Sequence, residues 1–379
     1  MSTKRVHVLF FTSQLGNGGA EKHLVRVANH LDRSRFRVSV AVARGGGSYE
    51  PELAGDIGFH VLNAPRMIRA RGPLRDLMGH LSPDVVCGVM SHAIVVAILA
   101  CAGQSRRPAI VGSVQDAIRL RQDVNRWRRL RGRLLRATLP HLYPRADHIV
   151  TLAQGVRRDL LKLVPQIEGR VSVIPNAGLN DADAEVGPPE SRPSGPVLVA
   201  SGRLAEQKGF SYLLDALRIL RERIPATLWL LGEGPLRGQL QEQAERLGIA
   251  DAVRFLGFRA DPHAFVRAAD VFVLSSIYES FGNVIVEAMA VGTPVVAANC
   301  PYGPAEIIHD GVNGVLVPPR DPAALADAVQ RLLDEPALRA RVGEAGRARA
   351  RDFAASVIAE QYGALFERVH AGRGVPASV

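Results

Sequence analysis

The chain has 379 residues, a formal net charge of +10 and a sequence pI of about 10.1. Because single hydrophobic cores rarely grow past ~250 residues, this length favours two domains. Apolar residues make up 47% of the chain and charged residues 22%, which excludes an intrinsically disordered protein, and the positive charge favours an anionic partner.

The cysteines and the N-terminus both bear on the compartment. Cys87, Cys101 and Cys300 have no C-x-x-C spacing, so neither a disulfide framework nor a thiolate metal site is predicted, and a reducing compartment is favoured. The apolar stretch near the N-terminus is too short for a secretory signal. We therefore expect a cytoplasmic protein.

Short β-branched runs alternate with helical patterns in the first half of the chain, as is typical of a parallel α/β sheet. A helix is expected from Gly19, because Ala20, Leu24, Val27 and Leu31 form one apolar stripe. The expected strands of this half are residues 6–11, 38–43, 85–89, 109–113, 148–152 and 171–174.

Residues 85–103 are almost apolar enough and long enough to span a bilayer. Gly88 and the polar pair Ser91 and His92 interrupt this run near its middle. A buried strand, a turn and a buried helix account for the pattern better than a membrane span does.

Residues 181–196 lose all apolar periodicity and are rich in Pro, Gly, Ser and acids, which predicts a linker. A second alternation of strands and helices follows it. We therefore expect an α/β protein with two doubly wound domains, and ligands at the carboxyl ends of their strands. The expected strands of this half are residues 197–201, 227–231, 253–256, 271–274, 294–298 and 314–317.

The strongest local pattern is SSIYESFGNVIVEAMA at 275–290, where a strand ends, a loop turns through Gly282 and a helix begins near Asn283. The free amides and positive dipole end of a helix start can hold an anion such as a diphosphate. Glu279 would then lie near a sugar and Glu287 near a ribose, since carboxylates accept hydrogen bonds from hydroxyls. The alternative is that Glu279 only complements the helix dipole and Glu287 is a solvated acid.

A second pattern, GRLAEQKG at 202–209, directly follows an expected strand. Arg203 and Lys208 project from this loop, and such cations can neutralise a diphosphate leaving group without a metal ion. The alternative is a solvated loop with two exposed cations.

The remaining patterns exclude several classes of site. GNGGAE at 16–21 could contact phosphate through its amides, but it lacks the spacing of a dinucleotide site and the ending of a P-loop. Asp181 and Asp183 have the D-x-D form of a metal site, yet a linker lacks the rigid support that metal ligands need. The histidines have no zinc-site spacing. We expect neither a metal ion nor another cofactor.

A basic segment, residues 117–145, combines many arginines with Trp127 and several leucines. This composition is typical of a helix that lies on an anionic membrane. A solvated basic face is the next alternative, and nucleic acid ranks last because no RNA- or DNA-binding motif accompanies the charge.

Seven segments, in this order, resemble the retaining GT-B-fold glycosyltransferases of family four (group 1), in particular the GGAE-type bacterial branch that makes polysaccharides and lipid-linked glycans. The resemblance covers nearly the whole chain and implies two Rossmann-like domains that face a central cleft. The segments are GGAEK at 18–22, VIPNA at 173–177, SGRLAEQKGF at 201–210, LLGEGPL at 230–236, FLGF at 255–258, ADVFVLSSIYESFGNVIVEAMAVGTPVVA at 269–297 and DGVNGVLVPPRDP at 310–322.

The resemblance implies an organisation in four parts. These are an N-terminal acceptor-binding domain at 1–180, the linker at 181–196, a nucleotide-sugar-binding domain at 197–353, and a C-terminal helix at 354–379 that crosses back to the N-terminal domain.

The resemblance also implies residue roles. Glu279 and Glu287 match the two acids of the family's E-x7-E motif, and Glu279, Arg203 and Lys208 are the candidate catalytic residues. The implied donor-binding residues are Gly18, Gly19, Arg203, Lys208, Phe258, Glu279, Phe281, Gly282, Asn283, Val284 and Glu287.

The acceptor side departs from the family pattern. Many members have a histidine after the fifth strand, where this chain has Gln115 followed by Asp116, and Ala153 replaces a common serine. Asp116 or the leaving phosphate is therefore expected to take the acceptor proton. The acceptor-side candidates are His92, Gln115 and Asp116.

These features predict an enzyme that moves a hexosyl or N-acetylhexosaminyl group from a nucleoside-diphosphate donor, UDP before GDP, to a glycan or polyprenyl-linked acceptor with retention. Such an enzyme would serve polysaccharide or lipopolysaccharide synthesis at the inner face of the cell membrane. The alternatives are a nucleotide-sugar epimerase of the same architecture and a non-enzymatic basic protein that binds membranes.

Overall fold

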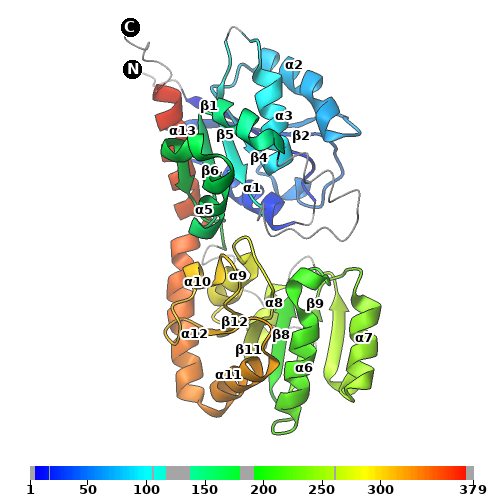
Figure 1. Ribbon diagram of the computed structural model, residues 1–379. Coiled ribbons are helices and arrows are strands. Elements are labelled where there is room, and N and C mark those ends of the chain that lie inside the picture. The colour runs from blue at the N-terminus through cyan, green and yellow to red at the C-terminus, as the bar shows by residue number, and fades with distance from the viewer. Residues whose placement is uncertain are drawn as a thin grey trace. The chain divides into compact units, whose positions relative to one another are not determined.

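The computed structural model describes residues 5–16, 18–104, 106–116, 137–179, 192–259 and 262–372. The chain divides into two compact units. Unit 1 comprises Met1–Ala177 with Ala355–Val379, and unit 2 comprises Gly178–Ala354. In each unit a parallel sheet is covered by helices (Figure 1).

Unit 1 contains a seven-stranded parallel sheet with the order β3-β2-β1-β4-β5-β6-β7. Its strands are β1 (Val6–Thr12), β2 (Phe36–Val42), β3 (Gly58–Val61), β4 (Val85–Val89), β5 (Ala109–Val114), β6 (His148–Thr151) and β7 (Val171–Val173). Its helices are α1 (Gly19–His30), α2 (Arg71–Leu81), α3 (Ser91–Cys101), α5 (Gln154–Leu163) and α13 (Ala355–Ala371), with 3-10 turns η1 (Glu50–Glu52), η2 (Met67–Ala70), η3 (Tyr143–Arg145) and η4 (Pro165–Arg170).

Unit 2 contains a six-stranded parallel sheet with the order β10-β9-β8-β11-β12-β13. Its strands are β8 (Val197–Ser201), β9 (Thr227–Leu231), β10 (Val253–Gly257), β11 (Val271–Leu274), β12 (Val295–Ala298) and β13 (Val315–Val317). Its helices are α6 (Phe210–Arg221), α7 (Arg237–Arg246), α8 (His263–Ala268), α9 (Asn283–Ala290), α10 (Pro304–Ile307), α11 (Pro322–Asp334) and α12 (Pro336–Ala350), with 3-10 turns η6 (Glu206–Lys208), η7 (Ala250–Ala252) and η8 (Arg351–Phe353).

The core of unit 1 joins the first strand to the last helix. Phe10 on β1 meets Phe366 on α13 edge to face, with ring centroids 5.8 Å apart, and both side chains are fully buried. At the surface, Arg35 forms ion pairs with Glu360 and Glu367 of the same helix. Apolar burial therefore holds α13 on the sheet, and exposed ion pairs add little to it.

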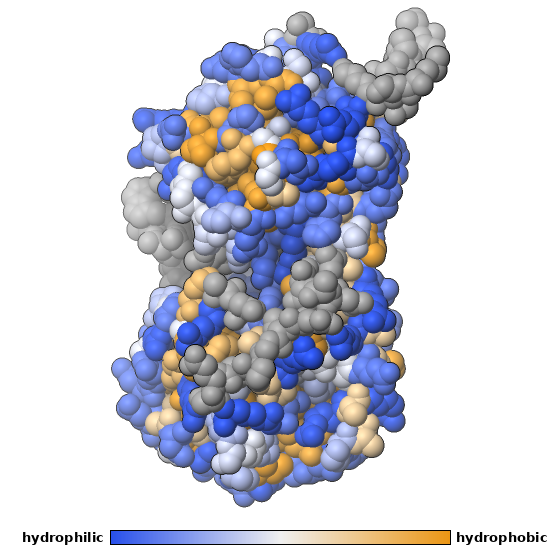
Figure 2. All heavy atoms as spheres, turned by 180° about the vertical axis from the view of Figure 1, so that it is seen from behind, coloured by the Kyte–Doolittle hydropathy of each residue, from blue (hydrophilic) through white to orange (hydrophobic). Residues whose placement is uncertain are grey.

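The alternation of strands and helices expected in both halves of the chain is present. Each expected strand is found within two residues at either end, and the α/β fold class is confirmed. Residues 85–103 form the buried strand β4 and the buried helix α3, and no helix in the described ranges is long and apolar enough to cross a membrane. On the face seen in Figure 2, polar areas alternate with apolar patches among the described residues.

One strand was missed, and three expectations lie outside the described residues. The edge strand β3 has only four residues, GFHV, with no β-branched run to signal it. Most of the linker, the pair Asp181 and Asp183, and residues 117–136 of the basic segment belong to the parts that the structure does not describe.

Replacing Phe366 with alanine is expected to lower the free energy of unfolding of unit 1 by about 3–5 kcal/mol, because a fully buried ring is lost from the core. Urea denaturation followed by circular dichroism measures the change. The control is Val357→Ala on the exposed side of the same helix, which should change it by less than about 0.5 kcal/mol. Equal effects of the two substitutions would contradict this account of the core.

Candidate functional site

In unit 2, the loop after β8 is bonded to the loop after β11. The Ile277 amide donates to the Gln207 carbonyl over 2.8 Å, and the Gln207 side-chain amide donates to the Tyr278 carbonyl over 3.1 Å. The Ser275 hydroxyl donates to the Lys208 carbonyl over 2.9 Å. The two segments that the sequence singled out separately therefore form one structure.

Two glycines allow the loops of unit 2 to approach this closely. Gly209 has φ of +60°, and a Cβ there would overlap the carbonyl oxygen of Ser275. A Cβ on Gly303 would overlap the carbonyl oxygen of Phe281. Glycine is required at both positions because the backbones touch.

A buried ion pair lies where these loops meet. Lys208 Nζ donates to Glu279 Oε1 over 2.6 Å, and the Ser276 hydroxyl donates to the same oxygen over 2.7 Å. The side chains of Lys208 and Glu279 are only 16% and 7% exposed. Both of these hydrogen bonds end on Oε1. No described residue donates a hydrogen bond to Oε2 of Glu279.

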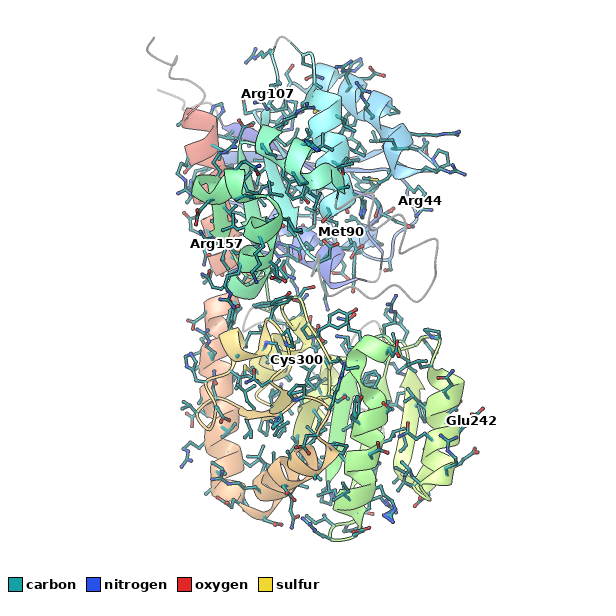
Figure 3. All side chains as sticks on the ribbon, in the orientation of Figure 1. Arg44, Met90, Arg107, Arg157, Glu242 and Cys300 are labelled. Carbon is teal, nitrogen blue, oxygen red and sulfur yellow. The ribbon has the colours of Figure 1, made fainter. Side chains whose placement is uncertain are left out.

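The loop after β12 is also bonded to Glu279. The Glu279 amide donates to the Pro301 carbonyl over 2.9 Å, and Cys300 lies beside Pro301 (Figure 3). Burial, together with the negative charge of Glu279, raises the pKa of the Cys300 thiol to about 12. Cys300 is therefore a neutral, buried neighbour of the carboxylate and no nucleophile.

The start of α9 has the geometry of an anion site. Gly282 caps the helix with φ of +103°, and Asn283 and Val284 are its first residues, partly exposed. The Phe281 ring is buried against Phe353, so Phe281 anchors this turn through its side chain and can offer a ligand only its backbone. Glu287 is partly exposed one turn further on.

Arg203 and Phe258 are exposed at the carboxyl ends of β8 and β10. The neighbouring Leu204 is buried, and its amide donates to the Glu233 carbonyl over 3.0 Å, which holds the turn that carries Arg203. Neither Arg203 nor Phe258 has a bond to the Lys208–Glu279 pair in the described structure.

In unit 1, the glycine loop leads into α1. Gly18 caps the helix and Gly19 is its first residue, whereas Asn17 lies outside the described residues. The Glu21 carboxylate folds back so far that a Cβ on Gly18 would overlap it. Burial raises the pKa of Glu21 above its ordinary value.

The acceptor-side candidates follow two adjacent strands, β4 and β5. The Ser91 hydroxyl donates to Asp116 Oδ1 over 3.0 Å, and His92 is the next residue of α3, partly exposed. Met90, at the end of β4 (Figure 3), has φ of +80°, which is rare for a residue with a side chain. The buried Gln115 amide donates to the Ser113 hydroxyl over 2.9 Å.

A buried chain of hydrogen bonds, which the sequence did not predict, extends from Gln115. The Ala177 amide donates to His23 Nδ1 over 2.9 Å, so the proton of the neutral ring is on Nε2, which faces the Tyr362 hydroxyl at 3.3 Å. Tyr362 in turn bonds to Ser113 over 3.0 Å. Burial, and then the charge of Arg26, lowers the pKa of His23 to about 3. No local pattern marks this chain, since His23 and Tyr362 are 339 residues apart.

Comparison with known proteins identifies the family. The model of glycosyl transferases group 1 matches residues 182–349, and that of glycosyltransferase family 4 matches residues 17–177. The chain belongs to the group 1 glycosyltransferases. The curated relatives that it resembles include the lipopolysaccharide core biosynthesis glycosyltransferase LpsE of Rhizobium meliloti, at 41% identity over 152 residues, 40% of this chain and 43% of LpsE. This match thus spans less than half of the relative.

Solved structures show the same fold over almost the whole chain. HepE of Anabaena, in complex with UDP and glucose, aligns with a TM-score of 0.79 at 24% identity and covers 96% of this chain and 100% of HepE. Sucrose-phosphate synthase of Thermosynechococcus elongatus aligns with a TM-score of 0.80 at 20% identity, over 97% and 100%. The GT-B architecture expected from the sequence is confirmed.

The free energy of unfolding is expected to decrease as the pH falls from 6.5 toward 3, partly through His23. The unfolded histidine binds a proton below its ordinary pKa of 6.5, whereas the folded one does so only near 3, so the stability is complete above 6.5 and is lost on acidification. His23→Gln should reduce the slope by up to about 1.4 kcal/mol per pH unit in this range. Urea unfolding of both proteins at several pH values tests this, and identical slopes would contradict it.

Proposed function

We propose that this chain is a retaining glycosyltransferase that takes a sugar from a nucleoside diphosphate, UDP before GDP, and transfers it to a hydroxyl of a glycan or lipid-linked glycan. The observation that carries the proposal is the buried Lys208–Glu279 pair beside the start of α9. A buried charge pair with one carboxylate oxygen not engaged by a described residue, next to the positive end of a helix, suits the joint between a diphosphate and a sugar.

The donor half of the mechanism stabilises the leaving group. Lys208 spends one of its three N–H donors on Glu279, so two remain for diphosphate oxygens. The amides of Asn283 and Val284 and the exposed Arg203 supply further positive potential. This set can balance the developing charge without a metal ion, and such stabilisation is usually the largest catalytic contribution.

Glu279 and the acceptor-side residues would then direct the sugar. Oε2 of Glu279 is free to accept a sugar hydroxyl or to support positive charge at the anomeric carbon, while Oε1 stays with Lys208 and Ser276. The acceptor hydroxyl attacks on the face that the diphosphate leaves, which retains the configuration. Its proton goes to the departing phosphate or to Asp116.

The names of similar proteins support the choice of substrates. HepE was crystallised with UDP and glucose, and LpsE acts in lipopolysaccharide core biosynthesis. We therefore place UDP-hexoses or UDP-N-acetylhexosamines first as donors and cell-surface glycans first as acceptors. We also propose cytoplasmic action at the inner face of the membrane.

Lys208→Ala and Glu279→Gln are each expected to lower turnover by about 10²–10³-fold, because each removes charge at the reacting centre. Turnover is measured as the release of UDP or GDP in the presence of bacterial glycan acceptors. The donors to test are UDP-glucose, UDP-N-acetylglucosamine and GDP-mannose. Arg218→Ala, at an exposed ion pair on α6, is the control and should be fully active. Near-normal turnover of either site variant would refute the assignment. An isomerised nucleotide sugar formed from donor alone would instead indicate an epimerase, and NMR of the product reports retention.

Ser276→Ala is expected to lower kcat by about tenfold with little change in UDP affinity, because Glu279 loses the neutral hydrogen bond that fixes its orientation. Ser276→Thr keeps the hydroxyl and should restore part of the activity. Steady-state kinetics and calorimetric titration with UDP separate the two effects. A loss of UDP affinity equal to the loss in kcat would show that Ser276 supports the whole loop and does not specifically orient Glu279.

A further inference from the structure

A short exposed segment of unit 1 carries one apolar side chain with arginines next to it in the sequence. It covers η2, the residues just before it and the first residue of α2. Ile68 is 58% exposed, and Arg66 and Arg69 on either side of it are exposed as well. Arg71 begins the next helix and is also exposed. We refer to residues 65–71 as the Ile68 surface.

The charge of the Ile68 surface is not neutralised within the chain. The side chains of Arg66 and Arg69 form no hydrogen bond or ion pair with any described residue, whereas Arg71 donates to the Leu99 carbonyl over 3.1 Å. The sequence contains no acid between Asp56 and Asp76. Two exposed arginines without internal partners, next to an exposed isoleucine, give this part of the surface a positive potential that attracts an anionic partner.

We propose that the Ile68 surface docks unit 1 on an anionic phospholipid membrane. Arg66 is the extended residue that precedes the 3-10 turn η2, and Ile68 and Arg69 lie within this turn, so the three exposed side chains belong to one short segment of the surface. Arginine side chains can keep their charged groups at the level of lipid phosphates while their apolar stems and a neighbouring isoleucine enter the headgroup boundary. Met67, which is partly exposed, adds apolar area.

The composition of this surface favours lipid over nucleic acid. Binding of single strands relies on aromatic side chains that stack on bases. The sequence has no Phe, Tyr or Trp from residue 60 to 81. An exposed aliphatic side chain gains nothing from a phosphate backbone, but it gains from insertion among acyl chains.

This surface is distinct from the donor-site residues of unit 2 and does not depend on the proposed reaction. It includes none of residues 117–136 of the basic segment. The proposal therefore concerns where the chain is held, and it can fail or succeed independently of what the chain catalyses.

Flotation with vesicles tests the proposal on the full-length protein. The wild-type chain should bind vesicles of equal parts phosphatidylcholine and phosphatidylglycerol at low salt, should be released by high salt, and should not bind phosphatidylcholine alone. The double variant Arg66→Glu/Arg69→Glu should bind at least about tenfold more weakly. Ile68→Ser should bind roughly tenfold more weakly as well, because the inserted side chain is lost.

The matched control is Arg254→Glu/Arg341→Glu, which makes the same change in charge at two exposed arginines of unit 2 and should bind vesicles like the wild type. Thermal unfolding checks that every variant is folded. Lys208→Ala should also bind normally, which separates this proposal from the catalytic one.

Several results would overturn the docking surface. The first is a wild-type chain that does not bind the anionic vesicles. The second is a control variant whose vesicle binding weakens as much as that of Arg66→Glu/Arg69→Glu. The third is normal vesicle binding of Arg66→Glu/Arg69→Glu together with loss of vesicle binding in Arg128→Glu/Arg129→Glu. Unchanged vesicle binding of Ile68→Ser, with single-stranded RNA binding that depends on Arg66 and Arg69, would identify a nucleic-acid surface instead.

Discussion

A buried ion pair between Lys208 and Glu279 is the constraint around which unit 2 is arranged. Removing two charges from water costs more than their attraction returns unless the geometry is held and further hydrogen bonds are supplied. Ser276 supplies one such bond, and Gly209 and Gly303 let three loops approach until their backbones touch. The loops after β8, β11 and β12 are thereby joined, and a ligand would meet a carboxylate and an ammonium group that are already positioned.

In unit 1, the buried polar side chains around His23 are neutral and hydrogen-bond to neutral partners, whereas unit 2 buries an ion pair. His23 is kept neutral by burial, and the single-donor amide of Ala177 sets the direction of the hydrogen bonds toward Tyr362. The hydrogen bonds from Tyr362 to Ser113 and from Gln115 to Ser113 join neutral groups, and burying neutral groups costs less free energy than burying charges. Such a chain ties the last helix to the end of β5, beside the acceptor-side candidates, and makes that region sensitive to acid.

The effect of the net charge of +10 on binding depends on where the unpaired arginines lie on the surface. Many arginines are engaged in the fold, as Arg35 is with two glutamates of α13. Arg66 and Arg69 of the Ile68 surface form no such pairs with described residues, and they accompany the one strongly exposed isoleucine among the described residues. With the lipid-linked acceptors that we propose, a positive surface of this kind would concentrate the protein where its acceptors are.

The sequence by itself determined every strand except β3, the order of the two sheets along the chain and the family, because buried parallel strands need β-branched runs and tight loops need glycine at set positions. It also indicated Glu279, Lys208 and the start of α9, but as separate signals. Only the tertiary structure decided that Lys208 and Ser276 share one oxygen of Glu279, that His23 meets Tyr362, and that GFHV forms an edge strand. Contacts between residues 71 or 339 positions apart leave no periodicity in the chain, since they arise from packing and not from local conformation.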